Sequence, residues 1–293
     1  VIQREAAGDE SARFSDGKRR PCERAPRQAE QAVFRDRRSQ GASDDLAGWG
    51  VEASVGEEPR TVETAGELIK KGNEFYDKLQ PAEALKFYLP AEKLEPKNVK
   101  LLVKIARQYR HLMSEANRPE EKLRLGKVAL GYALRAVEID GNDGDAQLGL
   151  AITYGKLLPY QGSRDQFYNS RLVKSTVDKA IAIDPQSDLA WHVLGRWYLN
   201  VAEIGSVKRA LAQVAFGKIP LVKYEDAERC FLKAIDLNPR RLMHYIELGR
   251  AYAAMGRNAE AKKMICKGLE MAETEKDDPE TKALGRQILK KLP

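Results

Sequence analysis

Apolar residues over residues 189–239 recur at helical spacing, and small residues take fixed places among them. The order is W-x2-L-G-x2-Y, followed after an interval by A-x3-F-x2-A-x4-P. Apolar residues three and four positions apart form one face of a helix, so this stretch predicts two amphipathic helices. The large residues fill the space between the paired helices, the small ones allow close crossing, and proline stops the second helix.

The same order recurs four more times, so the chain repeats one two-helix unit. It is the tetratricopeptide signature, and five copies in phase predict an all-α solenoid of about five helical hairpins. Each copy carries a small residue in its first helix, where the second helix must approach closely. These residues are Gly72, Ala106, Ala151, Gly195 and Gly249.

The three middle units are longer than the outer two. The last signature aromatic of the first helix and the first small or apolar residue of the second lie nine residues apart in the outer units. In the middle units they lie 20, 19 and 29 residues apart, which predicts lengthened helices or inserted ones. Residues 205–217, bounded by glycines, predict one extra helix, and residues 279–292 predict a helix that caps the stack.

Residues 1–60 show no apolar periodicity and are rich in Arg, Ser, Gly and Asp. Such a segment buries too little apolar surface to offset its ordering entropy, so we expect it to be disordered. Its twelve acidic residues argue against a transit peptide. The sequence thus predicts two parts, a disordered segment 1–60 and a tetratricopeptide-like domain 61–293.

Charge is distributed unevenly between these two parts. The net charge is +7 for the chain, −1 for residues 1–60 and therefore +8 for residues 61–293. A basic folded part favours acidic partners. No stretch approaches the roughly 18 consecutive apolar residues of a membrane span. The three cysteines form no CxxC pair, which predicts neither a disulfide framework nor a metal site.

Several stretches around the insertions resemble the regulator of microtubule dynamics family. They are N-S-R-L-V-K at 169–174, D-K-A-I-A-I-D-P at 178–185, L-G-R-W-Y at 194–198 and A-F-G-K-I-P at 215–220. The resemblance covers residues 65–292 and implies a microtubule-associated protein of the cytoplasm and spindle poles. Some relatives carry an N-terminal membrane anchor, and this sequence shows none. The resemblance transfers no individual functional residue.

Solenoids of this kind bind partners on the concave face lined by the first helix of each unit. The position directly after the small residue points into that groove, and three of five units place arginine there. Guanidinium groups engage carboxylates bidentately, so a basic groove would suit the glutamate-rich tails of tubulin. The alternative is that these arginines are solvated or paired with Glu247 or Asp145. The predicted partner-binding residues are Asn73, Arg107, Arg110, His192, Arg196 and Arg250.

The insertions suggest a second surface, a basic rim, whose alternative is an ordinary solvated face. Its residues are Arg164, Arg171, Lys174, Lys208, Arg209 and Lys218.

Three other functions compete with a microtubule-binding scaffold. An enzyme is not favoured, because the three histidines stand in no catalytic motif and the chain lacks P-loop, GxSxG and GxGxxG sequences. A co-chaperone that clamps a C-terminal carboxylate would need a lysine where Ile69 stands and a basic pair where Asp145 and Gly149 stand. An RNA-binding repeat would need aromatics set out for base stacking. The sequence therefore predicts a non-enzymatic protein-binding scaffold with no cofactor and no metal, with a generic adaptor or co-chaperone as the alternative.

Overall fold

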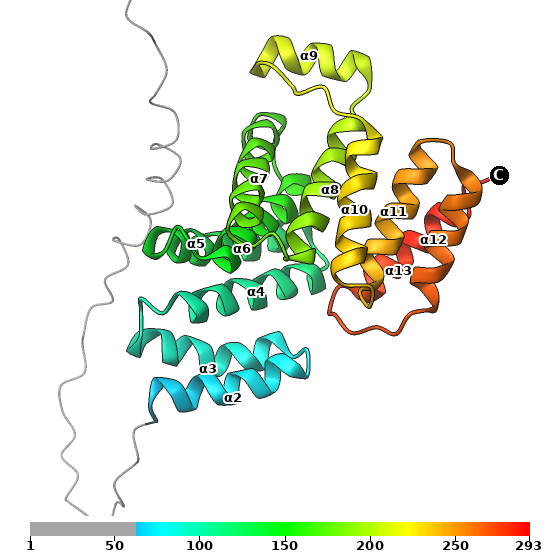
Figure 1. Cartoon of the computed structure of the whole chain (residues 1–293). Coiled ribbons are helices and arrows are strands. Elements are labelled where there is room, and N and C mark those ends of the chain that lie inside the picture. Colours follow the sequence, from blue (N-terminus) through cyan, green and yellow to red (C-terminus); the bar gives the residue numbers. More distant parts are fainter. Residues whose placement is uncertain (1–62) are drawn as a thin grey trace, which may run out of the picture. The chain divides into compact units, whose positions relative to one another are not determined.

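The computed structural model describes residues 63–293, and the predicted disordered segment 1–60 lies outside them. Within residues 63–293 the chain forms twelve α-helices, one 3₁₀ turn and no strand (Figure 1). The elements are α2 (Ala65–Asp77), α3 (Pro81–Leu94), α4 (Val99–Glu115), α5 (Pro119–Ile139), α6 (Gly144–Leu157), η2 (Leu158–Tyr160), α7 (Ser163–Ile183), α8 (Asp188–Ala202), α9 (Ser206–Phe216), α10 (Tyr224–Leu237), α11 (Leu242–Ala254), α12 (Asn258–Glu270) and α13 (Asp278–Leu289).

The helices pair into five antiparallel hairpins that follow the chain order. The pairs are α2 with α3, α4 with α5, α6 with α7, α8 with α10, and α11 with α12. Each hairpin packs on the next, and α13 packs on α11 and α12 at the end of the series. The prediction of about five tetratricopeptide-type units with a closing helix is confirmed. The division of the chain at residue 60 stays a prediction.

The insertions lengthen two second helices and add one helix. Helices α5 and α7 each have 21 residues, whereas α3 and α12 of the outer units have 14 and 13. In the fourth unit the extra residues form α9, which lies beyond the ends of α8 and α10 (Figure 1). The prediction of lengthened or inserted helices is confirmed, as is the extra helix between Gly205 and Gly217.

Four of the five first helices begin at side-chain caps, and α11 does not. Thr64 and Glu67 form a capping box at the start of α2. Asn98, Asp143 and Ser187 each accept a hydrogen bond from a backbone N–H in the first turn of α4, α6 and α8. Since these groups satisfy N–H donors that a helix leaves unpaired, they fix where these four helices start.

Small residues in the first helices let a large residue of the second helix pack against the backbone. A Cβ atom on Gly72 would lie 2.4 Å from the ring of Tyr88, and one on Gly195 would lie 2.8 Å from the ring of Phe231. Both rings are fully buried. The contact distances explain why these two units carry glycine at this position.

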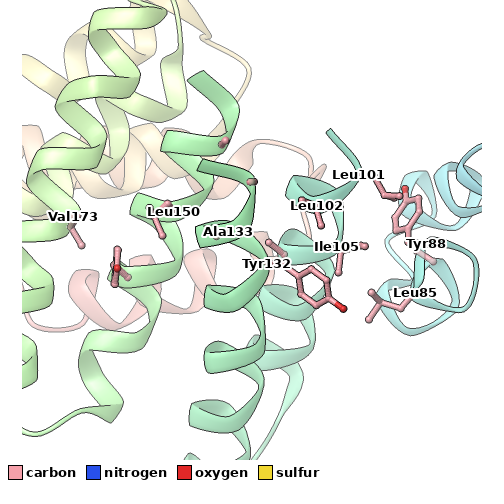
Figure 2. Packing of buried hydrophobic residues seen from close by; sticks show 14 of the residues in the cluster. Leu85, Tyr88, Leu101, Leu102, Ile105, Tyr132, Ala133, Leu150 and Val173 are labelled. Atoms are coloured by element: carbon pink, nitrogen blue, oxygen red, sulfur yellow. The ribbon is translucent and has the colours of Figure 1, made fainter. Parts of the chain in front are cut away.

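One apolar core runs from the first unit into the fourth. Its buried side chains come from helices α2 to α8 and from Ile219 after α9, and Figure 2 shows part of this packing between the helices. Residues that Figure 2 labels in this cluster are Leu85, Tyr88, Leu101, Leu102, Ile105, Tyr132, Ala133, Leu150 and Val173. Each hairpin therefore shares its core with its neighbours, as a solenoid requires.

Candidate functional site

The five first helices, α2, α4, α6, α8 and α11, carry all six residues predicted to bind a partner. We call the surface that these helices form the first-helix face. Neighbouring first helices contact one another from α4 to α11. The polar side chains on this face are joined in a network that differs between its two ends.

At the start of the face, Asn73 is already engaged. Its Oδ1 accepts hydrogen bonds from the Tyr88 hydroxyl and the Lys104 ammonium group, both at 2.8 Å. The ring of Tyr76 lies 5.0 Å from both Lys104 and the Arg107 guanidinium, within the range of a cation–π contact. These contacts link α2 to α4.

Arg107 faces partly into solvent and contacts an acidic residue from the far end of the chain. Its Nη2 lies 2.8 Å from Oε2 of Glu275, and its side chain is 32% exposed. Its Nε donates to Nε2 of His111 at 3.3 Å. Burial lowers the pKa of His111 to about 3, so the imidazole is neutral and can accept this bond.

Arg110, one turn further along α4, is buried and only 6% exposed. Its Nη1 donates to the carbonyl oxygen of Gly149 at 3.2 Å and to Thr153 Oγ1 at 3.1 Å, which joins α4 to α6. Burial lowers the pKa of Arg110 to about 10, so it stays charged at neutral pH. Among residues 63–293 the structure records no carboxylate in a salt bridge with it.

His192 is also buried and belongs to a chain of three polar side chains between α8 and α11. His244 Nε2 lies 2.9 Å from the Asp188 carboxylate, and His244 Nδ1 lies 3.0 Å from His192 Nδ1. Because a carboxylate only accepts, His244 donates from Nε2 and receives the proton of His192 at Nδ1. Burial lowers the pKa of both histidines, which keeps both neutral.

Arg196 and Arg250 share one buried carboxylate, that of Glu247 on α11. The ion-pair distance is 3.2 Å for each arginine, and the Glu247 side chain is 5% exposed. Arg250 also contacts Glu203 at 2.6 Å and Asn200 at 2.8 Å. Arg196 keeps half of its side chain in solvent. At this end of the face, each of the two arginines is therefore paired with an acid of a neighbouring helix or its C-cap.

An acidic segment lies against the first-helix face where α4, α6 and the start of α11 meet it. It comprises residues 273–278, with the sequence E-T-E-K-D-D. It includes most of the connection between α12 and α13 (Figure 1). Glu275 lies between Arg107 of α4, at 2.8 Å, and Arg241 at the start of α11, at 3.0 Å. Asp277 lies 2.8 Å from Lys156 of α6. Lys276 lies 2.6 Å from a carboxylate at the end of α4.

The fully buried carboxylate of Asp278 gives the acidic segment its shape. Its Oδ2 accepts hydrogen bonds from the backbone N–H groups of Thr274 and Glu275, both at 2.7 Å. Burial raises the pKa of Asp277, but the charge and hydrogen bond of Lys156 outweigh it, so the net pKa is lowered. The segment therefore presents ionised carboxylates to the face.

Sequence reasoning missed this segment. The available signal was four acidic residues among six, placed just before the predicted capping helix. The contact could not be predicted from spacing, because Arg107 and Glu275 are 168 residues apart in the sequence.

The predicted basic rim lies on α7 and the α9 insertion. The rings of Phe167 and Phe216 join these elements with centroids 5.6 Å apart. Arg209 donates to two backbone carbonyl oxygens that flank α9, at 2.7 and 2.8 Å, and so helps to hold the insertion. Lys208 and Lys218 are exposed.

The rim residues of α7 contact side chains of their own helix, and Lys174 also lies 5.7 Å from the rings of Trp197 and Tyr198 on α8. The guanidinium groups of Arg164 and Arg171 each lie 5.9 Å from an aromatic ring of α7. Lys174 forms an ion pair with Asp178 at 2.6 Å. A binding role for the rim and for the first-helix residues stays a prediction. In the part of the chain that the structure describes, no three His, Cys, Asp or Glu side chains gather as a metal site.

None of the helices within residues 63–293 meets the length and hydropathy of a membrane span.

Solved structures show where else this fold occurs. A thermophilic tetratricopeptide protein from Thermus thermophilus matches with a TM-score of 0.57 and 19% identity, covering 76% of this chain and all of that one. The Cut9–Hcn1 hetero-tetramer of the APC/C matches with a TM-score of 0.55 and 14% identity, covering 78% of this chain and 37% of that one.

Relatives by sequence carry one family name. Regulator of microtubule dynamics protein 1 of Bos taurus is 26% identical over 227 residues, which are 76% of this chain and 71% of that protein. The Mus musculus protein 1 is 30% identical over 161 residues, 54% of this chain and 52% of that one. Protein 3 of Xenopus laevis is 23% identical over 225 residues, 76% of this chain and 49% of that one.

The chain thus spans between about half and about seven tenths of these relatives. The sequence model of the family regulator of microtubule dynamics protein 1-3 matches residues 68–293, which are the five helical hairpins and the closing helix. By this match the chain belongs to the regulator of microtubule dynamics family.

Proposed function

We propose that this chain is a non-enzymatic protein-binding scaffold that acts on microtubules, and that its first-helix face takes the acidic tails of tubulin. One observation carries the proposal. Cations of α4, α6 and α11 already hold the carboxylates of a non-helical peptide segment on this face. Guanidinium groups stay charged at any working pH and match carboxylate geometry. A glutamate-rich tail offers the same chemical group.

The chemistry of the histidines supports a scaffold over an enzyme. His192 and His244 are bonded to each other inside the protein, and His111 accepts a bond from Arg107. Burial lowers the pKa of all three, so none is poised near neutral pH for proton transfer. Their positions fit structural roles.

The family name supports microtubules as the partner. We propose the cytoplasm and spindle poles as the place of action, which only the resemblance to the family implies. An adaptor or co-chaperone that binds another acidic protein is the second candidate. The same cations would serve it, so the partner must be identified by experiment.

The test is co-sedimentation of the full chain with taxol-stabilised microtubules, before and after subtilisin removes the tubulin tails, at low and physiological salt. Arg107→Glu reverses a charge on the face. Arg229→Glu is the matched control, because Arg229 lies on α10, is 71% exposed and pairs only locally with Asp226.

We expect salt-sensitive binding that is lost with the tails and with Arg107→Glu but kept in Arg229→Glu. Binding that survives tail removal would keep the microtubule role and exclude this face as the receptor for tails. Absence of sedimentation at both salt concentrations would favour the adaptor.

A further inference from the structure

We propose that the first-helix face contains a peptide site for two carboxylates two residues apart, and that the chain's own acidic segment fills it in the resting state. Arg107, Arg241 and Lys156 form the site, and Glu275 and Asp277 occupy it. The proposal rests on the proposed function and deepens it. An acidic partner must displace the segment in order to bind.

The first subsite holds Glu275 between two guanidinium groups from different units. Arg107 Nη2 lies 2.8 Å from Oε2, and Arg241 Nη1 lies 3.0 Å from Oε1, so each carboxylate oxygen has its own cation. The side chains are 18–32% exposed, which leaves the subsite open to solvent. A carboxylate from another peptide could therefore reach the same position.

The second subsite holds Asp277 on α6. Lys156 Nζ lies 2.8 Å from Oδ2 of Asp277 and 2.7 Å from the Ser114 hydroxyl, so a hydroxyl of α4 fixes the ammonium group. The buried guanidinium of Arg110 adds positive charge to this region. The negative charge of Asp277 favours the protonated form of Arg110. The subsite is therefore more basic than its one ion pair indicates.

The acidic segment is held to the face mainly by charge. None of residues 271–277 is buried, and the buried Asp278 bonds to the segment's own backbone. Ion pairs between partly exposed groups are weak individually and are screened by salt. Docking of the segment can thus be reversed without unfolding a hairpin.

The residue between the two carboxylates, Lys276, indicates which peptide sequence the site should bind more tightly. Lys276 lies 2.6 Å from Glu115, which is 42% exposed at the end of α4. A ligand with a basic residue between its carboxylates reproduces this pair, whereas a run of glutamates places like charges together. We therefore expect an E-K-D sequence to bind more tightly than E-E-E.

The experiment measures the affinity of the full chain for a fluorescently labelled octaglutamate peptide by anisotropy. The double variant Glu275→Gln/Asp277→Asn removes the negative charge of both occupants and leaves the three cations of the site in place. The matched control Asp236→Asn/Glu260→Gln changes net charge equally, on the second helices α10 and α12, where both acids are paired only locally.

An occupied site weakens external binding through the high effective concentration of a tethered competitor. We therefore expect the double variant to bind about tenfold more tightly than the wild type, and the control to bind as the wild type does. Equal affinity in all three chains would overturn self-occupancy and leave the proposed function in place. Equal gains in both variants would also overturn it, because the gain would then reflect net charge.

Failure of all three chains to bind the peptide would overturn the site itself. Tail-dependent co-sedimentation then decides the proposed function separately, because it requires no knowledge of the subsites. A peptide with E-K-D in place of the central glutamates tests the role of Glu115, and weaker binding than octaglutamate would contradict the expected preference.

Discussion

The two ends of the first-helix face carry the same residue type at the same repeat position, with different surroundings. Arg107, Arg196 and Arg250 each follow the small residue of their unit. At the α8–α11 end, the arginines meet Glu247, which is on a helix and 5% exposed. At the α4–α6 end, Arg107 meets Glu275, which is on a connection and 22% exposed.

An arginine can bind a partner only if the acid that pairs with it can move away, and this depends on whether that acid lies on a helix or on a connection. Glu247 cannot leave α11 without unfolding it, so we expect its two arginines to stay paired with it, while a binding role for them stays a prediction. Glu275 can leave with its connection, which would expose Arg107 and leave Arg241 paired with Asp188 alone. The repeat position alone therefore does not define a binding residue.

The largest expected effect is on stability at the α8–α11 end. Glu247→Ala leaves two guanidinium groups without their shared carboxylate, one of them half exposed and able to rehydrate. We expect a loss of about 2 kcal/mol in the free energy of unfolding, measured by urea titration. Glu275→Ala, which removes a partly exposed acid, should cost less than about 1 kcal/mol. Equal losses would contradict the distinction between the two ends.

Acid should destabilise both ends through their buried histidines. The pKa of each histidine is lowered in the folded state, so the unfolded chain binds more protons than the folded one below about pH 6.5. The free energy of unfolding therefore decreases as the pH is lowered. For His111, whose folded pKa is about 3, the loss between pH 7 and pH 5 is about 2 kcal/mol.

His111→Gln keeps an acceptor for Arg107 and should remove that share of the acid sensitivity, measured by thermal melts across this pH range. The acid sensitivity that comes from His192 and His244 should remain. An unchanged slope of stability against pH in the variant would show that His111 is not neutral in the folded protein.

The smallest expected effect is the coupling between Arg107 and Glu275. Arg107→Gln and Glu275→Gln should each loosen the acidic segment, and the loss in the double variant should be smaller than the sum of the two single losses. The coupling energy from the double-mutant cycle should be roughly 0.5–1 kcal/mol and should decrease with salt. Additive losses would mean that the two charges do not interact in solution.

Much of the fold follows from sequence because the repeat encodes it locally. The spacing around Gly195 and Phe231 fixes a hairpin, and the glycines at 205 and 217 bound an inserted helix. Sequence also offered Glu247 as an internal partner for the arginines, which the structure bears out. The other offered partner, Asp145, lies exposed in the first turn of α6.

The site was less predictable, because burial and long-range contacts depend on how successive units stack. Arg110 and His192 lie on the expected helices, but neighbouring first helices cover both. The acidic segment reaches α4 only through the path of all five hairpins. Spacing along the chain carries no information about that path.

The most direct test of the central claim is hydrogen exchange, read by mass spectrometry over residues 271–277 of the full chain with and without octaglutamate. The account predicts faster exchange in this segment when the peptide binds, because the tethered carboxylates leave Arg107, Arg241 and Lys156. Unchanged or slower exchange at saturating peptide would contradict it, since the peptide would then bind elsewhere or beside a segment that stays in place.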